Sequence, residues 1–457
     1  MNLFLKTDPR PLHFVGIGGA GMSALALVAL RRGIGVTGSD ADVTGVGDLV
    51  ARGAVVLPGS AAALIDGARA VVVSAAIPAH HPDLVRAREL GVPLVPRKEA
   101  LSGLIGAATS VAIAGTHGKT TTTVMTTEAL IGAGLDPTGL AGGRVESWGG
   151  NARMGGTEVF VVEADEYDQA FLALRPTIAV INNVEPDHLE CYGSVDAMEA
   201  AYVRFAGPAS RVLIGNDGPG SDRVASGFDA GRVWRFGPGA VGIRVDAIEA
   251  GPDGTRAVVR FPDAASVPLR LAVPGLHNLR NATAALGAVH ALGGDRRRAA
   301  DALAEFRGVG RRFERVGEVA GVTIVDDYAH HPTELAATIA AARQAFPGRR
   351  LVAVFQPHLY SRTALHADAM GAALGGADLA LVTDVYGARE APVPGVTGAL
   401  VADAARGHGV RVVYQPDRGA LAATVAEQAR AGDVIVTMGA GDVTRVGREL
   451  LQTLAAR

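Results

Sequence analysis

The sequence has little cysteine, no concentrated positive charge and no long apolar run. Its 457 residues include one cysteine, Cys191, which excludes a disulfide framework and a cysteine-rich zinc site. The formal net charge is −3 and no basic block occurs, so composition gives no support for a nucleic-acid partner. No apolar run reaches about 18 residues, and the first residues lack a signal-peptide pattern. We therefore expect a cytoplasmic protein without a membrane partner.

The length of the chain exceeds that of one ordinary hydrophobic core, which favours two or three domains. Apolar residues make up 48% of the chain, as is typical of compact α/β domains. Taken in order, the motifs predict an α/β protein of three domains. These are an N-terminal Rossmann-like parallel sheet (1–106), a central P-loop-type ATPase domain with added antiparallel strands (107–308), and a C-terminal Rossmann-like domain (309–457).

The most informative stretch is the loop Gly115-Thr-His-Gly-Lys119-Thr120. It follows a β-branched run at 110–113 and precedes a run that reads as a helix from 123 to 132. In such a strand, glycine loop and helix, backbone N–H groups and the helix dipole face a phosphate. Lys119 reaches the outer phosphates, and the Thr120 hydroxyl can bind Mg²⁺. The spacing departs from the standard pattern, so a glycine turn with an incidental lysine is the alternative.

The N-terminal segment carries a second glycine pattern. Gly16, Gly18 and Gly21 satisfy G-x-G-x-x-G between a predicted strand and helix, and Asp40 follows about twenty residues later, where a ribose-binding acid is expected. Ser74 ends another predicted strand. The pattern fits NAD or a UDP-linked substrate equally well, and a purely structural turn is the alternative.

Polar residues also follow two predicted strands of the central domain. Glu163 ends one strand and His188 follows another, so both are expected at the sheet edge that carries the lysine loop. Thr120 and Glu163 would bind one Mg²⁺, with His188 near a second. A helix-capping acid and a turn histidine are the structural alternatives. The run from 142 to 153 is interpreted as a polar, glycine-rich loop that contacts a ligand.

Further along, three short runs at 242–247, 256–261 and 267–273 predict antiparallel strands, and a helix follows them. His277, Asn278 and Asn281 fall in its first turn, where helix capping and contact with a base both remain open. Polar turns follow the strands predicted at 322–327 and 351–355.

Together these motifs resemble the Mur ligases, from one end of the chain to the other. The resemblance rests on Gly16-Ile-Gly-Gly-Ala-Gly-Met-Ser23, Gly115-Thr-His-Gly-Lys-Thr-Thr121, Glu163-Ala-Asp-Glu166, Asn182-Asn-Val-Glu-Pro-Asp-His188, His277-Asn278, Asp326-Asp-Tyr-Ala-His-His-Pro-Thr-Glu334 and Gln356-Pro-His-Leu-Tyr-Ser-Arg362.

The resemblance implies ATP- and Mg²⁺-dependent joining of L-alanine to the lactyl carboxylate of UDP-N-acetylmuramate in peptidoglycan precursor synthesis, through an acyl phosphate, by a monomer or weak homodimer. It implies UDP-substrate contacts from Gly18, Gly19, Ala20, Gly21, Met22, Ser23, Asp40, Ser74, Asn151 and Arg153. It implies ATP contacts from Gly115, Thr116, His117, Gly118, Lys119, Thr120, Thr121, His277, Asn278, Arg312 and Asp326. Around the amino acid it places His330, His358 and Arg362, of which Arg362 pairs with the carboxylate. Catalysis is assigned to Lys119, Glu163, His188, His330 and Arg362, and metal binding to Thr120, Glu163 and His188.

Three positions depart from the family pattern: Leu359 replaces an arginine, Arg204 stands near the place of a carbamylated lysine, and His81-Pro82 replaces Asn-Pro. Two rival functions remain open. One is a murein-recycling ligase that joins a tripeptide to the same sugar nucleotide. The other, from a different class, is an NAD-dependent oxidoreductase, which would leave Lys119 and Glu163 without a role.

Overall fold

A computed structural model describes residues 3–388 and 390–456, which divide into two compact units. The first unit holds the described residues up to Ala247, together with Ala257–Leu269 and Arg280–Glu305. The second holds Ile248–Arg256, Arg270–Leu279 and the described residues from Phe306 onward. The boundaries of the three sequence-derived domains stay a prediction.

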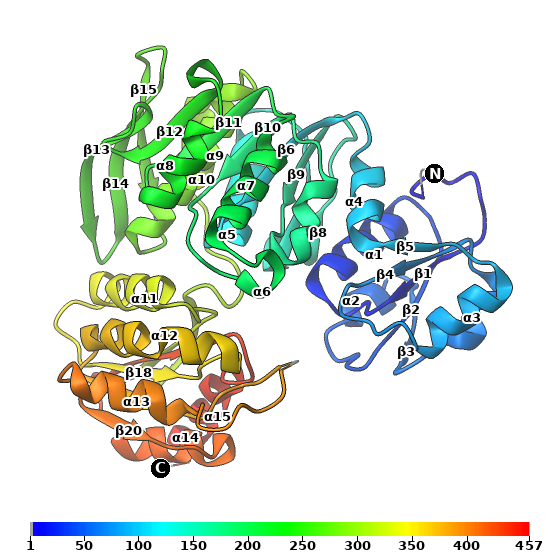
Figure 1. Cartoon of the computed structure of the whole chain (residues 1–457). Helices are drawn as coiled ribbons and strands as arrows, with labels where there is room; N and C mark the ends of the chain where they lie inside the picture. The colour runs from blue at the N-terminus through cyan, green and yellow to red at the C-terminus, as the bar shows by residue number, and fades with distance from the viewer. Residues whose placement is uncertain (1–2, 389, 457) are drawn as a thin grey trace. The chain divides into compact units, whose positions relative to one another are not determined.

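The N-terminal segment forms a five-stranded sheet in the order β3-β2-β1-β4-β5, with all neighbours parallel (Figure 1). This confirms the predicted parallel sheet; the short edge strand β3 was not predicted. The strands are β1 (Leu12–Val15), β2 (Val36–Asp40), β3 (Val55–Pro58), β4 (Ala70–Val73) and β5 (Leu94–Pro96). The helices are α1 (Ala20–Arg31), α2 (Gly47–Val50), η1 (Ala62–Gly67), α3 (Pro82–Leu90) and α4 (Arg97–Ile105).

The central sheet has ten strands in the order β15-β14-β13-β12-β11-β10-β6-β9-β7-β8. Its first strands are β6 (Thr109–Ala114), β7 (Thr138–Val145), β8 (Gly150–Arg153), β9 (Val159–Glu163), β10 (Ile178–Ile181) and β11 (Arg211–Gly215). Its last are β12 (Val233–Pro238), β13 (Gly242–Gly251), β14 (Gly254–Arg260) and β15 (Ser266–Leu271). The α-helices are α5 (Lys119–Gly132), α6 (Leu189–Tyr192), α7 (Val195–Ala206), α8 (Pro219–Ser226), α9 (Leu276–Ala291) and α10 (Arg296–Ala304). Short 3-10 turns are η2 (Glu146–Trp148), η3 (Tyr167–Ala173) and η4 (Ala230–Arg232).

The predicted loop at 142–153 is wrong. This stretch is largely the β7–β8 hairpin, whose strands pair antiparallel while β7 also pairs parallel with β9. A Cβ atom on Gly142 would lie 2.5 Å from both carboxylate oxygens of Glu163. Glycine is therefore needed here because a neighbouring side chain approaches a strand closely, and not because the segment is a loop.

The C-terminal sheet has the order β16-β17-β21-β18-β19-β20, with β16 antiparallel to β17 and the other neighbours parallel. Its strands are β16 (Glu314–Val319), β17 (Val322–Asp327), β18 (Leu351–Phe355), β19 (Leu379–Val382), β20 (Val412–Tyr414) and β21 (Val434–Met438). Its helices are α11 (Pro332–Ala345), α12 (Tyr360–Ala373), η5 (Leu374–Gly376), α13 (Gly398–Gly407), α14 (Arg418–Gln428) and α15 (Thr444–Ala455). The strands predicted at 322–327 and 351–355 are confirmed as β17 and β18, whereas the edge strand β16 was not predicted.

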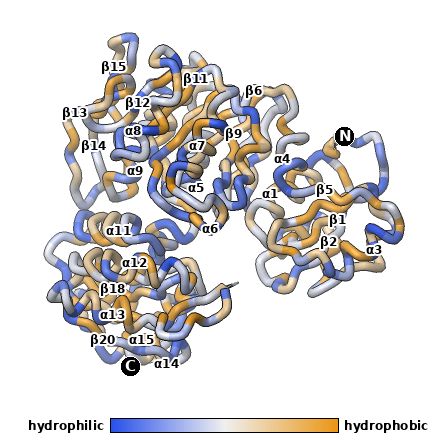
Figure 2. The backbone as a smooth tube through the Cα atoms, viewed as in Figure 1, coloured by the Kyte–Doolittle hydropathy of each residue, from blue (hydrophilic) through white to orange (hydrophobic). Residues whose placement is uncertain are grey.

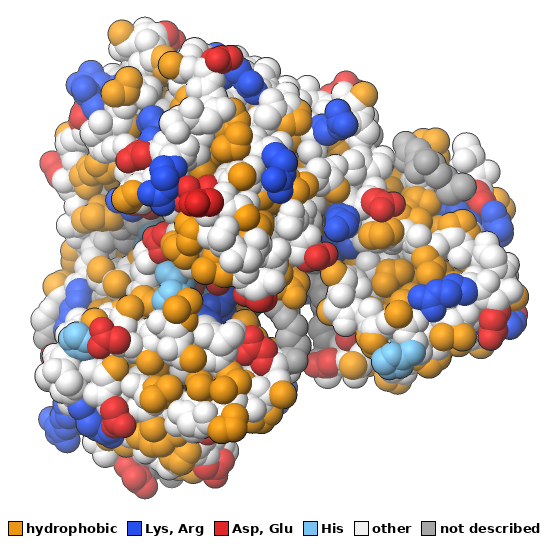
Figure 3. All heavy atoms as spheres, in the orientation of Figure 1, with side chains coloured by type: hydrophobic (Ala, Val, Ile, Leu, Met, Phe, Trp, Pro, Cys, Tyr) orange, Lys and Arg blue, Asp and Glu red, His pale blue; other side chains and the backbone are white. Residues whose placement is uncertain are grey.

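Buried hydrophobic residues lie both along the strands and along the helices, as the colouring in Figure 2 illustrates. In the second unit, two separate hydrophobic clusters pack on the C-terminal sheet, as expected of a sheet with helices on both faces. Acidic and basic side chains are interspersed on the face seen in Figure 3. Among the described residues, no helix is both long and apolar enough to cross a membrane.

Candidate active site

The N-terminal glycine loop is held by two residues at the end of the neighbouring strand. The carbonyl of Ser39 accepts hydrogen bonds from the N–H groups of Gly16 (2.8 Å) and Ile17 (3.1 Å). The carboxylate of Asp40 accepts from the N–H of Gly18 at 2.7 Å. Ser74 lies against the same turn, since a Cβ on Gly16 would lie 3.2 Å from the Ser74 Cβ. The predicted residues Asp40 and Ser74 thus both lie at this loop.

Only one of the two predicted muramoyl-contacting residues is joined to this region. The side chain of Asn151 donates to the carbonyl of Ala20 and to the Ser23 hydroxyl, both at 3.1 Å. Arg153 instead forms an ion pair with Asp136 at 2.5 Å. Asn151 is therefore placed at the start of α1.

The lysine loop has the predicted strand–loop–helix geometry, but its helix begins earlier than the sequence suggested. Helix α5 starts at Lys119, directly after Gly118, whose φ of +78° makes it a left-handed cap. Thr120 and Thr121 lie buried in its first turn. Their N–H groups belong to the positive end of the helix dipole, as a phosphate site requires.

The ammonium group of Lys119 makes three hydrogen bonds within the protein. It donates to the carbonyls of Gly115 (2.7 Å) and Thr116 (3.2 Å), and to a carboxylate oxygen of Glu166 at 2.7 Å. Burial alone would lower the pKa of Lys119, but the Glu166 carboxylate outweighs this effect and raises the pKa above its ordinary value. Lys119 is thus a permanent cation, and a phosphate would have to compete with Glu166 for it.

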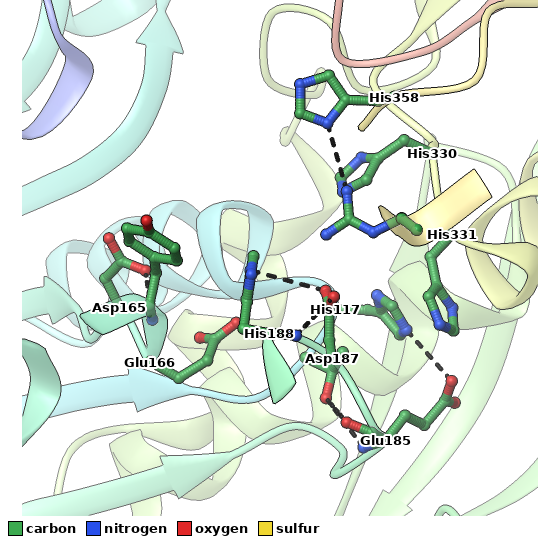
Figure 4. A network of polar contacts seen from close by, with 12 residues as sticks. His117, Asp165, Glu166, Glu185, Asp187, His188, His330, His331 and His358 are labelled. Carbon is green, nitrogen blue, oxygen red and sulfur yellow. Dashed lines mark hydrogen bonds and ion pairs between the residues drawn. The ribbon is translucent and has the colours of Figure 1, made fainter. Parts of the chain in front are cut away.

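Two asparagines that the sequence analysis quoted without a role hold the lysine loop. Asn183 accepts from the N–H of His117 at 2.8 Å, and the Asn182 side chain donates to the carbonyl of His117 and the Thr122 hydroxyl. The His117 ring lies 3.3 Å from the Glu185 carboxylate (Figure 4). Asn182 and Asn183 directly follow β10, and this position at a strand end is the sequence feature from which their role could have been predicted.

Three adjacent strands bring the lysine loop, Glu163 and His188 to one edge of the sheet. Strand β6 lies between β9 and β10 and is parallel to both, so all three end at the same side, as predicted. His188 lies 3.7 Å from Asp187 and beside Glu166 (Figure 4). One Glu166 oxygen is buried and has no hydrogen-bond partner within the described part of the chain. Such an orphaned oxygen, with the Asp165 carboxylate nearby, fits a hard cation such as Mg²⁺.

On helix α9, which was predicted from 276, the two asparagines have different neighbours. The Asn278 side chain donates to the carbonyl of Pro274 at 2.7 Å, next to His277 in the second unit. In the first unit, Asn281 lies against the lysine loop, since a Cβ on Gly118 would be 2.7 Å from the Asn281 Oδ1 atom. Asn281 is therefore a loop neighbour that local capping does not explain.

In the C-terminal domain, Asp326 is paired by a residue that the sequence analysis missed. Arg311 lies 3.5 Å from the Asp326 carboxylate, which also accepts from the hydroxyls of Thr437 and Thr444. The predicted Arg312 lies over the Tyr328 ring. Next to Asp326, burial raises the pKa of Asp327 to about 6, against the opposing charge of Arg312.

The three residues predicted around the amino acid form one cluster. The rings of His330 and His358 are 5.8 Å apart, and Arg362 Nη1 lies 3.3 Å from His358 Nδ1. The Tyr386 ring, which the sequence analysis did not single out, stacks on His358. Leu359, which stands where the family pattern has an arginine, is buried and has a φ of +67°. A buried apolar side chain therefore replaces the expected cation at this position.

The other two departures also have defined places. The Arg204 guanidinium lies 3.4 Å from the Gln169 side-chain oxygen. His81 caps α3 by accepting from the N–H of Asp83.

This arrangement of domains and motifs is that of a known protein family. Family models match almost the whole chain: the Mur ligase catalytic domain at residues 11–109, the Mur ligase middle domain at 113–289 and the Mur ligase glutamate ligase domain at 311–441. The chain belongs to the Mur ligase family.

Relatives and solved structures of similar length agree with this. The chain is 46% identical to a UDP-N-acetylmuramate–L-alanine ligase of Mycolicibacterium vanbaalenii, over 99% of this Mur ligase and 98% of that protein. It is 42% identical to the ligase of the same name from Salinibacter ruber, with 98% and 97% coverage. The crystal structure of a UDP-N-acetylmuramate–alanine ligase from Thermotoga maritima is 28% identical, with a TM-score of 0.81 and 98% and 99% coverage. A murein peptide ligase from Psychrobacter arcticus is 26% identical, with a TM-score of 0.73 and the same coverage.

Proposed function

We propose that this Mur ligase joins L-alanine to the lactyl carboxylate of UDP-N-acetylmuramate at the expense of ATP, in peptidoglycan precursor synthesis. Full-length identity of 42–46% to proteins of that name supports the substrates. The observation that carries the chemistry is the edge formed by β6, β9 and β10, where Lys119, Glu163 and His188 follow adjacent parallel strands. An oxidoreductase would give none of these three a task.

The reaction needs a better leaving group than the carboxylate itself offers. The lactyl carboxylate attacks the γ-phosphate of ATP, ADP leaves, and an acyl phosphate forms. The amino group of alanine then attacks the acyl carbon, and phosphate departs as the amide forms. Phosphoryl transfer depends mainly on positioning and charge neutralisation, so a fixed cation beside the loop amides is the central requirement.

In this scheme Lys119 exchanges Glu166 for the outer phosphates of ATP, while the loop amides and the start of α5 hold the remaining phosphate oxygens. Thr120 and Glu163 would hold one Mg²⁺, and His188 a second. When bound, these ions neutralise charge on the transferred group. The glycine loop before α1, with Asp40 and Ser74, binds the UDP portion, and Asn151 lies close enough to that helix to contact the muramoyl portion.

In the C-terminal domain, Arg362 pairs with the carboxylate of the incoming alanine, and His330 and His358 flank it. ATP contacts from His277, Asn278, Arg312 and Asp326 stay predictions from the family resemblance. The cytoplasmic location and the monomeric or weakly dimeric state stay predictions.

The test is phosphate release with ATP, Mg²⁺ and UDP-N-acetylmuramate, supplied in turn with alanine, glycine, serine and the L-alanyl-γ-D-glutamyl-diaminopimelate tripeptide. We expect release with alanine to exceed that with the tripeptide. Preference for the tripeptide would favour the recycling ligase. No phosphate release with any acceptor, together with hydride transfer to a nicotinamide cofactor, would overturn the proposal.

A further inference from the structure

A buried carboxylate that no part of the proposed mechanism uses is linked through Ser39 to the N-terminal glycine loop. Asp83 is 0% exposed and accepts four hydrogen bonds. The hydroxyls of Ser39 and Ser60 each donate at 2.5 Å, the N–H of Ala61 at 2.9 Å, and His13 Nε2 lies 3.3 Å away.

The donors come from three neighbouring strands of the sheet or the residues that follow them. His13 is on β1, Ser39 is next to the last residue of β2, and Ser60 and Ala61 follow β3. Asp83 itself stands in the first turn of α3. Hydrogen bonds to a charged acceptor are stronger than those to a neutral one. The Asp83 carboxylate therefore holds these strands in place relative to α3.

From Asp83 the restraint passes to the loop through one residue. The Ser39 hydroxyl is anchored on Asp83, and the Ser39 carbonyl accepts the N–H groups of Gly16 and Ile17. The next residue, Asp40, accepts the N–H of Gly18. On its other side, the Asp40 carbonyl accepts the N–H of Gly59, which precedes the anchored Ser60. Three consecutive loop amides therefore depend on a dipeptide that Asp83 holds from both sides.

We propose that Asp83 is a positioning residue for the sugar-nucleotide substrate: through Ser39 it sets the backbone of the glycine loop and the Asp40 carboxylate, which bind the UDP portion. This inference rests on the proposed function, which assigns the loop to UDP binding. Asp83 itself touches no substrate, because it is fully buried. Its effect should therefore fall on affinity for the sugar nucleotide and leave the chemical step unchanged.

The test compares Ser39→Ala with Thr37→Val on the same strand. Both variants remove one hydroxyl from the network, but Thr37 bonds only to His13 (2.8 Å) and not to Asp83 or the loop. We expect Ser39→Ala to raise KM for UDP-N-acetylmuramate about fivefold or more, with kcat and KM for ATP within about twofold of wild type. Thr37→Val should leave all three constants near wild type. Unfolding curves of both variants identify any loss that reflects misfolding alone.

Asp83→Asn and Asp40→Ala complete the experiment. Asp83→Asn should raise the same KM as Ser39→Ala, and the double variant should show less than the sum of the two effects because both changes weaken the Ser39–Asp83 bond. Equal KM changes in Ser39→Ala and Thr37→Val, or a loss confined to kcat, would overturn the positioning role. If Asp40→Ala raises KM but Ser39→Ala and Asp83→Asn do not, only this inference fails. If Asp40→Ala has no effect on KM, the proposed UDP site itself is wrong.

Discussion

The glycine loop before α1 and the lysine loop before α5 share one backbone plan and differ in charge. In each, a strand runs through glycines into a helix, and a dipeptide at the end of the neighbouring parallel strand holds the loop amides. That dipeptide is Ser39-Asp40 for the first loop and Asn182-Asn183 for the second. The first support is anionic and its loop has no lysine; the second is neutral and its loop carries Lys119.

This difference in charge suits the first loop to binding the sugar nucleotide and the second to activating its carboxylate by phosphoryl transfer. A carboxylate beside loop amides suits a ligand that also offers hydroxyl donors, such as a ribose. The cation at this loop is an arginine from another element, because the Arg97 side chain lies against Gly21 at the start of α1. The lysine loop concentrates a buried ammonium group and a helix N-terminus on one anion, which is the arrangement that phosphoryl transfer needs. Variants in the two loops should therefore fail in different kinetic constants.

Removal of Lys119 should give the largest effect. Lys119→Ala leaves the buried Glu166 carboxylate without its cation and the transferred phosphoryl group without its nearest positive charge. We expect kcat to fall by about 10³-fold or more, measured as phosphate release, while UDP-N-acetylmuramate binding in calorimetry stays near wild type. Lys98→Ala is the control, since Lys98 lies 3.7 Å from Asp168 on the surface and should retain full turnover. If Lys119→Ala weakened UDP-N-acetylmuramate binding as strongly as it lowered kcat, the proposal that the two loops have different roles would be wrong.

Glu163→Gln should have the next largest effect. The variant retains an oxygen for the N–H of Gly142, which bonds Glu163 at 2.6 Å, but removes the charge that a divalent cation needs. We expect kcat to fall about 100-fold and the Mg²⁺ concentration that gives half-maximal activity to rise. The control is Glu158→Gln, an exposed residue just before the same strand. An unchanged Mg²⁺ requirement would remove Glu163 from the metal site.

Matched alanine substitutions in the two loops test their backbones. At Gly115 the φ is +130° and a Cβ would lie 2.9 Å from the backbone nitrogen of Asn182, so Gly115→Ala must strain the loop. Gly18 is not among the glycines with a left-handed φ, and a Cβ there would meet the Asp40 carboxylate oxygen at 3.0 Å and the Asp42 carbonyl at 3.1 Å. We expect Gly115→Ala to cost about 1–3 kcal/mol in unfolding free energy and Gly18→Ala clearly less. Urea unfolding measures both, and the reverse order would contradict the geometry.

The smallest effect concerns acid stability and belongs to the first loop alone. Burial by itself would raise the pKa of Asp83, but hydrogen bonds from His13, Ser39 and Ser60 outweigh it and hold the pKa well below its ordinary value. An acid whose pKa is lower in the folded state stabilises the fold above its ordinary pKa, and this contribution is lost as pH falls through the folded pKa. Asp83→Asn should therefore flatten the decline in unfolding free energy below about pH 4. A decline as steep as in wild type would show that Asp83 is not responsible.

Much of the fold could be predicted because the strands are short apolar runs that end in glycine or polar residues. The parallel strands that carry Gly115, Glu163 and His188 followed from this pattern alone. The β7–β8 hairpin could not be predicted in the same way, since the glycines at 142 and 143 look like loop residues. Only the approach of Glu163 to that strand explains why glycine is needed there.

The candidate site divides in the same way. Lys119, Thr120 and Asp40 stand at fixed spacings from glycines, so local pattern identified them. Ser39, Glu166 and Arg311 act through partners more than ten residues away, and no local spacing encodes such contacts.

By itself the sequence determined which segments become strands and helices and which residues end each strand, because hydrophobic period and glycine position act over a few residues. Only the tertiary structure decided which strand ends become neighbours. It thereby decided that Asp83 holds the first loop and that Glu166 faces Lys119. The physical reason is that a buried charge is stable only where donors or an opposite charge from distant segments meet it, and sheet order alone brings those segments together.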